Sequence, residues 1–487
     1  MWRVLWVIVV VRSLQDGLCK GDTIHELRVR LNELPSDLKD LYDHMIRNLE
    51  PRYRQQASEL FQLLLKANEV QTSGIYPLLL QVAFTNETSE QITSAPTMPL
   101  SEHDCQERCT DTNNRIRSRS CGLIESRQVR ANRIDIKTKK EVSVDCVDFI
   151  HRTVVEFLRL PEVWSEMIGF TATPKYDPCP QLFGSCVMMC KTMPRVRGIE
   201  PEINVLWHMM DRALIYASMA EDSGKPVPIA QLEELDKVMI SQWNNVLKCF
   251  SRLGKCDIDG HWAKGYTVDP LRQHVLTPND FASVALFHGL VNFLGKNIED
   301  ENKIKGMNTT QLLVNATRYI GAPPWDDSKA CSRACLISEA ALDIDRRSKL
   351  RPRWVGIAIK LLQAHADPNA RINGAVSAWS VMLSYVALTG KPHIKPVLHR
   401  EVERRGFAND FTRLLAEYIK HGADLSLSAT PDGPEARETI DQLFSQESGT
   451  LEEIDPWTDQ PSVLYSAQIM KLKAYFRRLM KVDDSLP

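Results

Sequence analysis

The stretch Val142–Trp164, VSVDCVDFIHRTVVEFLRLPEVW, decides the fold, because a strand pattern changes there into a helix pattern within a few residues. Val142, Val144 and Cys146 alternate with polar residues, which is the period of a half-buried strand. Further apolar residues continue the run as far as Ile150. The pattern therefore predicts a strand that leaves the core at about this point.

A helix signal follows the strand directly. Thr153 and Glu156 have the Thr-x-x-Glu spacing of a capping box, in which the two side chains satisfy backbone N–H groups that the first helical turn leaves free. The spacing predicts a helix that begins at Val154 and ends before Pro161. His151 is then expected at the exit of the strand, immediately before the helix. The residues expected on the core face of this helix are Val154, Phe157 and Leu158.

The residues upstream predict a partner for the strand. Cys121–Glu125 is a short apolar run, and the span 126–141 is polar and rich in Arg and Lys, so it is expected to be a solvated loop. Two short strands joined by a loop and followed by a helix form the wing of a winged helix. The basic residues of this region are Arg115, Arg117, Arg119, Arg127, Arg130, Arg133, Lys137, Lys139 and Lys140. They form either a solvated face or a patch for nucleic acid or an acidic partner, and we favour the solvated face because no aromatic side chain is interleaved for base stacking.

Two segments carry a resemblance to a known family. The run FIHRTVVEFL (149–158) and the opening WVIVVVRSLQDGL (6–18) with GDTIHELRVRLNELPSDLKDLYDHMI (21–46) resemble fungal NACHT-type STAND proteins after their nucleotide-binding core. In that family the end of the NACHT module and its winged helix precede a helical or repeat sensor. The resemblance implies a signalling role through a protein partner, with non-self recognition and programmed cell death as candidate outcomes.

The resemblance also singles out His151 as a candidate nucleotide sensor. Ile150-His151-Arg152 occupies the position of the Met-His-Asp motif of related plant immune receptors, whose histidine contacts bound ADP. The third residue here is Arg152 in place of Asp, which departs from that motif. The alternative is a strand-end histidine hydrogen-bonded to the backbone, and we favour this alternative.

The chain lacks the phosphate-binding motif of a STAND ATPase. Such a site needs G-x-x-x-x-G-K-[ST], whose backbone N–H groups, Lys and hydroxyl hold the phosphates and Mg²⁺. The nearest fragments, Leu294–Asn297 and Gly254–Cys256, lack the first Gly and the hydroxyl. We therefore predict no catalytic residue, no cofactor and no enzymatic activity. The resemblance places residue 1 after the P-loop of the family, so we expect a truncated gene product, a misassigned start or a stand-alone regulatory remnant.

Composition bounds the function further. The 487 residues include 60 Lys and Arg against 62 Asp and Glu, a net charge of −2, which excludes a globally basic surface for nucleic acid. The apolar run Val4–Val11 is too short to cross a bilayer, and Arg12 ends it. Arg3 alone does not make the basic start of a signal peptide. We expect a cytoplasmic chain with no membrane and no nucleic-acid partner.

Cysteine spacing raises the question of a metal site. The 12 cysteines include three Cys-x-x-x-Cys pairs, whose sulfurs share one face of a helix. A zinc site needs two further ligands, and His103 with Cys121 could supply them to the first pair. We favour reduced thiols and no metal. The pairs are Cys105/Cys109, Cys186/Cys190 and Cys331/Cys335.

The C-terminal part contains two similar helix-to-turn segments. Ala358–Asn369 (AIKLLQAHADPN) and Leu414–Leu425 (LLAEYIKHGADL) resemble the ankyrin ending LLLEHGADPN. The resemblance predicts a left-handed residue after each helix, at His365 and Gly422. The copies lie farther apart than the ankyrin period of about 33 residues, which predicts an insertion at Leu388–Phe411. Glu299–Gly321 is a candidate third copy, and Val463–Met480 is a predicted terminal helix.

These observations predict a mainly α fold: a helical bundle with a small winged-helix β-hairpin, a helical region, and degenerate ankyrin-like helical repeats. The span 85–103 is expected to be a loop, since it is polar and contains two prolines. The predicted parts are the helical end of a NACHT-like module (1–50), a winged-helix-like domain (51–165), a helical spacer (182–298), the repeats (299–430), and a linker with a C-terminal helix (431–487).

The leading functional hypothesis is a non-enzymatic regulatory part of a fungal STAND-type signalling protein that binds protein partners through its C-terminal repeats. One alternative is an NTPase subunit or fragment whose site is completed by another chain. The other is a plain ankyrin-type scaffold with no signalling role.

Overall fold

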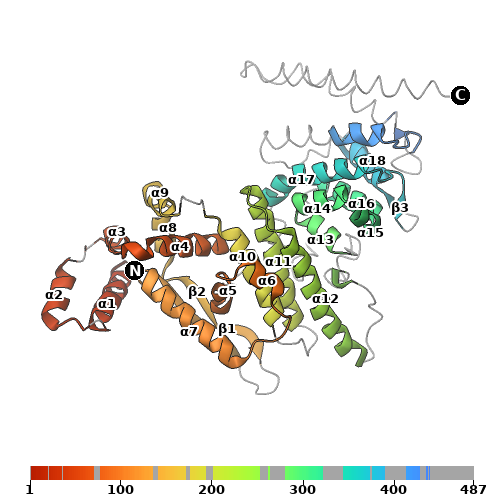
Figure 1. Cartoon of the computed structure of the whole chain (residues 1–487). Coiled ribbons are helices and arrows are strands. Elements are labelled where there is room, and N and C mark those ends of the chain that lie inside the picture. Colours follow the sequence, from red (N-terminus) through yellow and green to blue (C-terminus); the bar gives the residue numbers. More distant parts are fainter. Residues whose placement is uncertain are drawn as a thin grey trace, which may run out of the picture. The chain divides into compact units, whose positions relative to one another are not determined.

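The structure is a computed structural model that describes residues 2–19, 21–33, 35, 37–70, 77–134, 141–171, 176–193, 201–252, 261–263, 280–321, 344–372, 376–389, 413–427, 435–436 and 438. The chain divides into two compact units, Met1–Asp259 and Gly260–Pro487. Both units are mainly α-helical, as predicted, and the regular strands of the described residues form two antiparallel pairs (Figure 1).

The first unit consists of helices around one strand pair. In chain order its elements are α1 (Trp2–Cys19), α2 (Ile24–Glu33), α3 (Leu38–Arg47), the 3₁₀ turn η1 (Pro51–Tyr53), α4 (Arg54–Glu69), α5 (Leu79–Phe84), α6 (Ser89–Ser94), α7 (Glu102–Arg119), β1 (Ile124–Ile134), β2 (Glu141–Phe149), α8 (Arg152–Leu158), α9 (Pro161–Gly169), α10 (Pro178–Thr192), α11 (Pro201–Asp222) and α12 (Ile229–Arg252).

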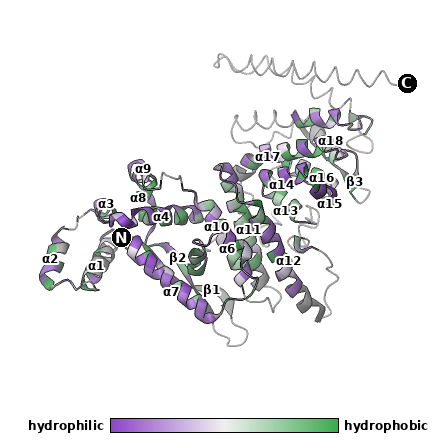
Figure 2. Cartoon of the chain, viewed as in Figure 1, coloured by the Kyte–Doolittle hydropathy of each residue, from purple (hydrophilic) through white to green (hydrophobic). Residues whose placement is uncertain are grey.

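Helix α10 forms the centre of the first unit, because α4, α5, α6, α11 and α12 all pack against it. Figure 2 shows hydrophobic residues gathered where α5, α10 and α11 meet, whereas α7 is hydrophilic along most of its length. Glycine at position 184 lets α6 approach α10 closely, since a Cβ there would collide with Ile92. The fully buried residues of α10 include Phe183, Cys186, Val187 and Cys190.

Lys191 joins three helices at the end of this core. Its side chain is fully buried, and Nζ donates to the carbonyl oxygens of Ile92 at 2.7 Å and Ala95 at 2.6 Å. The same ammonium pairs with Glu234 Oε1 at 2.6 Å. The carbonyls at the C-terminal end of α6 have no partner inside their own helix, so Lys191 satisfies them from α10 while Glu234 of α12 balances its charge.

The predicted strand pair exists, but its first strand is much longer than expected. β1 runs from Ile124 to Ile134 and pairs antiparallel with β2, from Ile124 opposite Phe149 to Ile134 opposite Glu141. The span predicted as a solvated loop therefore begins as strand. Its polar residues are compatible with a strand because cross-strand backbone hydrogen bonds do not depend on side-chain polarity.

The start of α8 corrects the predicted capping box. The helix begins at Arg152 and His151 is its N-cap, whereas the box predicted a start at Val154. Thr153 Oγ1 lies 3.0 Å from the hydroxyl of Tyr42, and Glu156 lies 3.4 Å from Arg152 Nε, so neither side chain forms the box. The helix ends before Pro161 as predicted, and its core face is buried: Val154, Phe157 and Leu158.

The predicted loop at 85–103 contains a helix. Thr88 and Gln91 form a capping box at the start of α6, with the Thr88 N–H donating to Gln91 Oε1 at 2.7 Å and the Gln91 N–H donating to Thr88 Oγ1 at 3.3 Å. The span also includes the start of α7. The loop prediction was wrong because it rested on polar composition and two prolines. The Thr-x-x-Gln spacing of the capping box, which indicates a helix start, was not considered.

The second unit consists of short helices and one two-residue strand pair. In chain order its elements are α13 (Phe281–Phe287), α14 (Val291–Glu299), α15 (Glu301–Gly306), α16 (Thr309–Gly321), α17 (Ile344–Gln363), β3 (Arg371–Ile372), β4 (Val376–Ser377), α18 (Ala378–Thr389) and a helix over residues 413–420. α16 contacts α13, α17 and α18, so it holds the core of this unit.

The C-terminal end of α13 is closed by a left-handed glycine and by side chains of α17. Gly289 has φ +70°, and the N–H of Leu290 donates back to Ala285 O at 3.0 Å. Trp354 Nε1 donates to Leu286 O at 2.8 Å, and Arg353 Nη1 donates to Gly289 O at 2.9 Å. The carbonyl groups at this helix end are therefore satisfied from a second helix.

Some predictions lie outside the described residues. They are the Cys331/Cys335 pair, nearly all of the insertion at Leu388–Phe411, and the terminal helix Val463–Met480. The five-part division of the chain stays a prediction. Within the described residues, no helix combines the length and the apolar composition needed to cross a membrane.

Candidate functional site

His151 lies at the junction of β2 and α8 with its side chain turned to the helix. Its backbone is extended, with φ −162° and ψ 155°, and its Nδ1 accepts the Thr153 backbone N–H at 3.2 Å. Thr153 Oγ1 lies 3.0 Å from the same Nδ1 and 3.0 Å from the Tyr42 hydroxyl of α3. The three side chains form one network that ties α8 to α3.

This geometry defines what His151 can do chemically. Because Nδ1 accepts the N–H of Thr153, the neutral ring carries its proton on Nε2, which can donate one hydrogen bond. Tyr42 is buried, and burial raises the pKa of its hydroxyl, while the hydrogen bond between Tyr42 and Thr153 opposes this rise. The backbone bond is the one that the strand-end alternative predicts, and nucleotide sensing by His151 stays a prediction.

The geometry of α7 excludes the four-ligand zinc site considered for His103, Cys105, Cys109 and Cys121. The helix spans Glu102–Arg119, 18 residues, so its axis is about 27 Å long. His103 lies at its start and Cys121 lies beyond its end. One ion cannot bind both.

Burial raises the pKa of several described thiols, which keeps them protonated at neutral pH. Burial, followed by the neighbouring Cys105, raises the pKa of the Cys109 thiol to about 12. Burial also raises the pKa of the Cys186 thiol to about 12, with Arg212 opposing it, and raises that of Cys190 above its ordinary value. A metal must displace the thiol proton when it binds, so a raised pKa lowers the metal affinity of Cys109, Cys186 and Cys190. The absence of a bound metal stays a prediction.

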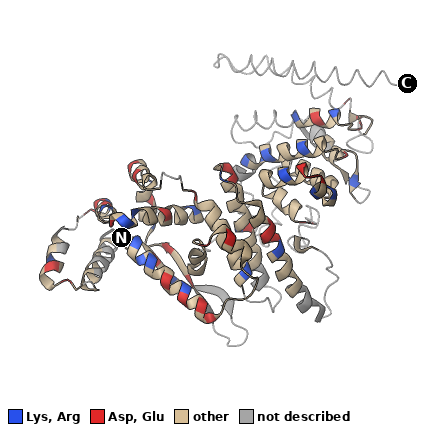
Figure 3. Cartoon of the chain, in the orientation of Figure 1, with Lys and Arg blue, Asp and Glu red and all other residues tan. Residues whose placement is uncertain are grey.

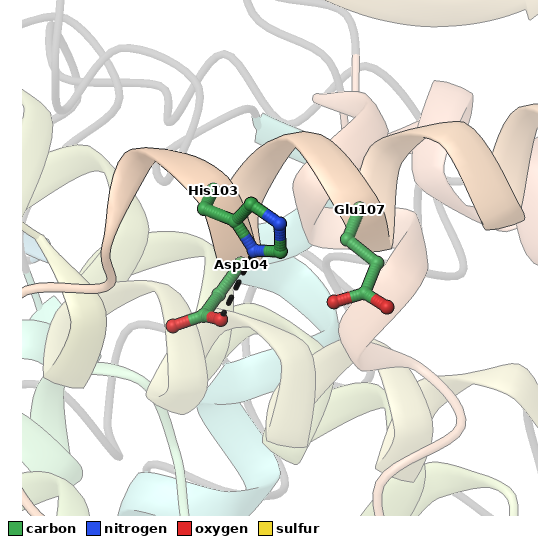
Figure 4. Close-up of side chains that lie close together, drawn as sticks. All are labelled: His103, Asp104 and Glu107. Carbon is green, nitrogen blue, oxygen red and sulfur yellow. Dashed lines mark ion pairs between the residues drawn. The ribbon is translucent and has the colours of Figure 1, made fainter.

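A different group of possible ligands lies at the start of α7. His103, Asp104 and Glu107 are exposed, and one ligand atom from each lies within 4.8 Å of the others (Figure 4). His103 Nδ1 is 3.8 Å from Asp104 Oδ1. A hard cation such as Ca²⁺ needs about six oxygen ligands. Carboxylates at a helix N-terminus are also favoured by the helix dipole, which accounts for them without a metal.

The basic cluster of the predicted wing is partly engaged inside the unit. The guanidinium of Arg119 lies 4.9 Å from the centre of the Tyr53 ring and donates to Gln56, and Arg127 pairs with Asp148 at 2.9 Å. Figure 3 shows that α7 is acidic at its N-terminal end and basic at its C-terminal end, which complements its own dipole. Lys137, Lys139 and Lys140 lie outside the described residues.

The two predicted repeat turns have the same backbone structure. His365 has φ +63° and Gly422 has φ +84°, so both predicted left-handed positions are confirmed. In the first turn, the N–H of Ala366 donates to Leu361 O at 2.9 Å, and in the second the N–H of Ala423 donates to Tyr418 O at 3.0 Å. These are the six-to-one bonds of the Schellman motif.

The aspartate after each turn folds the chain in the same way. Asp367 Oδ1 accepts the N–H of Asn369 at 2.8 Å, and Asp424 Oδ1 accepts the N–H of Ser426 at 2.9 Å. A side chain that accepts the N–H two residues on makes an Asx turn. The Ala-Asp pair therefore forms the same turn in both copies.

The two turns lie side by side and bond to each other. Asn369 Nδ2 donates to Gly422 O at 2.7 Å, and Asn369 Oδ1 accepts the N–H of Asp424 at 3.0 Å. Trp379 completes the contact, because its backbone N–H donates to Pro368 O at 2.9 Å and its Nε1 donates to Asp424 O at 2.7 Å. The copies are thus neighbours in space despite their separation in the chain.

A buried aromatic pair supports this contact from behind. Trp379 of α18 stacks on Tyr418, with ring centres 5.8 Å apart, and the Tyr418 hydroxyl bonds to Thr317 of α16. Burial raises the pKa of Tyr418, so its hydroxyl stays protonated at neutral pH. The sequence pattern missed Asn369 and Trp379 as coupling residues, although Asn369 is part of the quoted ankyrin-like ending.

Residues 48–198 match a family described as Domain of unknown function (DUF7791). The match runs from the end of α3 past the end of α10, so it includes the β1–β2 pair, α8 and His151, and it stops short of the second unit. It also crosses the predicted boundary between the parts 51–165 and 182–298. No curated protein and no solved structure matches the chain.

Proposed function

We propose that this chain is a non-enzymatic, cytoplasmic regulatory module of a fungal STAND-type signalling protein that binds a protein partner through its second unit. The observation that carries the proposal is the direct pairing of the two repeat turns through Asn369. Helical units that stack in this way bury one face against their neighbours and present the edges of their turns to a partner.

The residues along the turn edge suit protein binding. Asp367, Arg371, Lys420 and Asp424 are exposed around the paired turns, and the backbone beneath them is held by the bonds of Asn369 and Trp379. A rigid backbone with exposed charges of both signs loses little entropy when a partner binds. The charges supply orientation and specificity more than affinity.

The first unit supplies the regulatory part of the proposal. The resemblance to the region after a NACHT core and the DUF7791 match coincide over the β2–α8 junction. There the His151–Thr153–Tyr42 network connects the end of a strand to two helices. A junction of this kind can pass a change in strand position to the helices that follow, which is the role the resemblance implies for it.

The experiment that tests partner binding uses charge reversal on the turn edge. Partners captured by the whole chain would be purified, and their affinity measured for Arg371→Glu. Arg152→Glu is the matched control, because Arg152 is an exposed arginine on α8 of the first unit. Loss of affinity with Arg371→Glu alone supports the proposal. Loss with Arg152→Glu alone would move the binding surface to the first unit and contradict it.

The NTPase alternative is tested by calorimetry of ATP with Mg²⁺ on the purified chain. We expect no binding, because the sequence contains no G-x-x-x-x-G-K-[ST] motif to cradle the phosphates. A micromolar dissociation constant would defeat the non-enzymatic proposal.

The scaffold alternative predicts that partner binding and signalling are both indifferent to changes at the β2–α8 junction.

A further inference from the structure

An arginine side chain is enclosed in the core of the first unit. Arg212 of α11 is only 6% exposed, and its three guanidinium nitrogens are buried without a hydrogen-bond partner among the residues that the structure describes. The preceding residue, Asp211, is also buried, but no hydrogen bond joins the two side chains. A guanidinium stays protonated in proteins, so it cannot adapt to burial by losing its charge.

The other buried cation described in this unit shows how such a charge is normally compensated. Lys191 has Glu234 as a counter-ion at 2.6 Å and donates to two backbone carbonyl groups. A buried charge without such partners is strongly unfavourable, because it has lost its hydration and gained nothing in return. Arg212 therefore requires a partner that the described side chains do not supply.

The groups around Arg212 are neutral at neutral pH. Tyr216 follows one turn later on α11, which packs along α10, and both side chains interact electrostatically with Cys186 of α10. Burial raises the pKa of the Cys186 thiol to about 12, and Arg212 opposes this rise. Burial likewise raises the pKa of the Tyr216 hydroxyl, again with Arg212 opposing. Neither group supplies a negative charge.

Two further polar atoms lie unpaired in the same part of the core. The Tyr216 hydroxyl is fully buried and has no hydrogen-bond partner among the described residues. Gln81 of α5 is 1% exposed and donates through Nε2 to Cys186 Sγ at 3.3 Å, while its Oε1 is also without a described partner. Buried polar groups are rarely left unpaired, so several of them around one thiol point to a bound ligand.

We propose that Arg212 and Tyr216 bind a small oxyanion, a carboxylate or a phosphate, between α10 and α11. A planar guanidinium can donate two parallel N–H bonds to such a group, and the tyrosine hydroxyl can donate a third. A water molecule would pair these donors but would leave the charge uncompensated, so an anion fits better. Because the guanidinium is enclosed, the ligand enters when the two helices part locally, which a small anion requires least.

The test is thermal unfolding of the whole chain in potassium phosphate, potassium acetate and potassium chloride at matched ionic strength. A ligand that binds the folded state raises Tm with its concentration, so phosphate or acetate should stabilise the chain beyond chloride. Stabilisation by phosphate alone assigns a phosphoryl ligand, and stabilisation by acetate alone assigns a carboxylate. Arg212→Met should abolish this difference. Arg152→Met is the matched control, because it removes an exposed arginine of α8, and it should retain the difference.

Calorimetry of the effective anion on the purified chain gives the second readout. Arg212→Met should weaken the affinity by at least about tenfold, because it removes a charged donor. Tyr216→Phe should weaken it by about threefold to tenfold, because it removes one neutral donor and keeps the ring. The lost hydroxyl has no described partner, so this variant should fold even if Arg212→Met does not, and circular dichroism checks both.

Three results would overturn the proposal. The first is a wild-type chain that phosphate and acetate stabilise no more than chloride does, which would leave at most water beside Arg212. The second is equal stabilisation of the wild type and of folded Arg212→Met. The third is an unchanged anion affinity in Tyr216→Phe, which would place any bound anion elsewhere on the chain.

Discussion

His151 and His365 both lie at helix ends, the first at the N-terminus of α8 and the second just beyond the C-terminus of α17. At His151 the backbone is extended, a conformation open to any residue, and the side chain makes the structural bond to Thr153. At His365 the backbone is left-handed, and the structural bonds are made by backbone groups, namely its own N–H and that of Ala366. Side-chain identity therefore matters at the first position and backbone conformation at the second.

Other helix ends also differ in whether a side chain or the local backbone satisfies their carbonyl groups, and in two of them the side chain comes from another helix. The end of α6 depends on Lys191 of α10, and the end of α13 depends on both a glycine and side chains of α17. Helix ends closed by a distant side chain should be the most sensitive to mutation, because the removed group leaves buried partners unsatisfied. Ends closed by local backbone should respond only to changes in φ.

The largest effect is expected at Lys191. Replacing it by Met removes the buried ammonium from Ile92 O, Ala95 O and Glu234, which should destabilise the first unit by about 3 to 5 kcal/mol. Hydrogen exchange of α6 and α12 during denaturant titration measures the change. Adding Glu234→Gln to Lys191→Met should restore part of the loss, since it removes a carboxylate that would then keep only its 3.7 Å pairing with the exposed Lys237. A loss below about 1 kcal/mol would show that water replaces the ammonium.

Gly289→Ala should have the next largest effect. The residue has φ +70°, and an added Cβ would lie 2.6 Å from Leu350 Cδ2, whose side chain is itself buried. Conformational strain and the collision together should cost about 2 to 3 kcal/mol. Gly422→Ala is the matched control, because it has a similar φ of +84° with nothing within 4 Å of the added Cβ. Equal losses at the two positions would contradict the role of Leu350.

Gly422→Val tests the second repeat turn directly. A β-branched side chain at positive φ is strained, so the change should destabilise the second unit by about 1 to 2 kcal/mol. The backbone change at residue 422 should also move Gly422 O away from Asn369 Nδ2, from which it lies 2.7 Å in the wild-type structure. Asn369→Ala should therefore lose little further stability when combined with Gly422→Val, and a double-mutant cycle measures this coupling. Full additivity would mean that the turns do not depend on each other.

The sequence predicted the features whose determinants are local. Both repeat turns follow from a helix ending before an Ala-Asp pair, and the core face of α8 follows from helical spacing. The cap of α8 was mispredicted because the hydroxyl of Thr153 bonds to Tyr42, 111 residues away in the chain. Strand β1 was underestimated because its pairing with β2, rather than its own composition, stabilises it.

Lys191 and Asn369 also could not be predicted from local patterns, because their bonding partners lie far away in the chain. No sequence pattern pointed to Lys191, because its partners come from α6 and α12. Asn369 belongs to the ankyrin-like ending Ala358–Asn369, but its bonds to Gly422 and Asp424 connect the first copy to the second. Local patterns predict where a helix ends, and only the packed structure shows which distant group closes that end.

A smaller effect is expected at His151. Replacement by Ala removes the N-cap of α8 and one acceptor for the Thr153 N–H, which should cost about 1 kcal/mol. His151→Asn should retain most of the stability, since Asn is itself a good N-cap. Thermal unfolding of the three proteins measures the difference. If His151→Ala leaves stability unchanged but alters signalling, this result would favour nucleotide sensing over a structural role of His151 as the N-cap of α8.

The smallest effect is expected at His365, and its sign is the sharpest test of the comparison. His365→Gly removes a side chain from a left-handed position, where L-residues are strained by roughly 1 kcal/mol. Glycine also gives the unfolded chain more freedom, which offsets roughly half to all of that gain. We therefore expect a change between neutral and a few tenths of a kcal/mol of stabilisation, measured by denaturant unfolding of the second unit. If His365→Gly instead unfolds the unit, the imidazole makes an essential contact and the turn is not closed by backbone alone. In that case His365 would resemble His151, and the contrast between the two helix ends would fail.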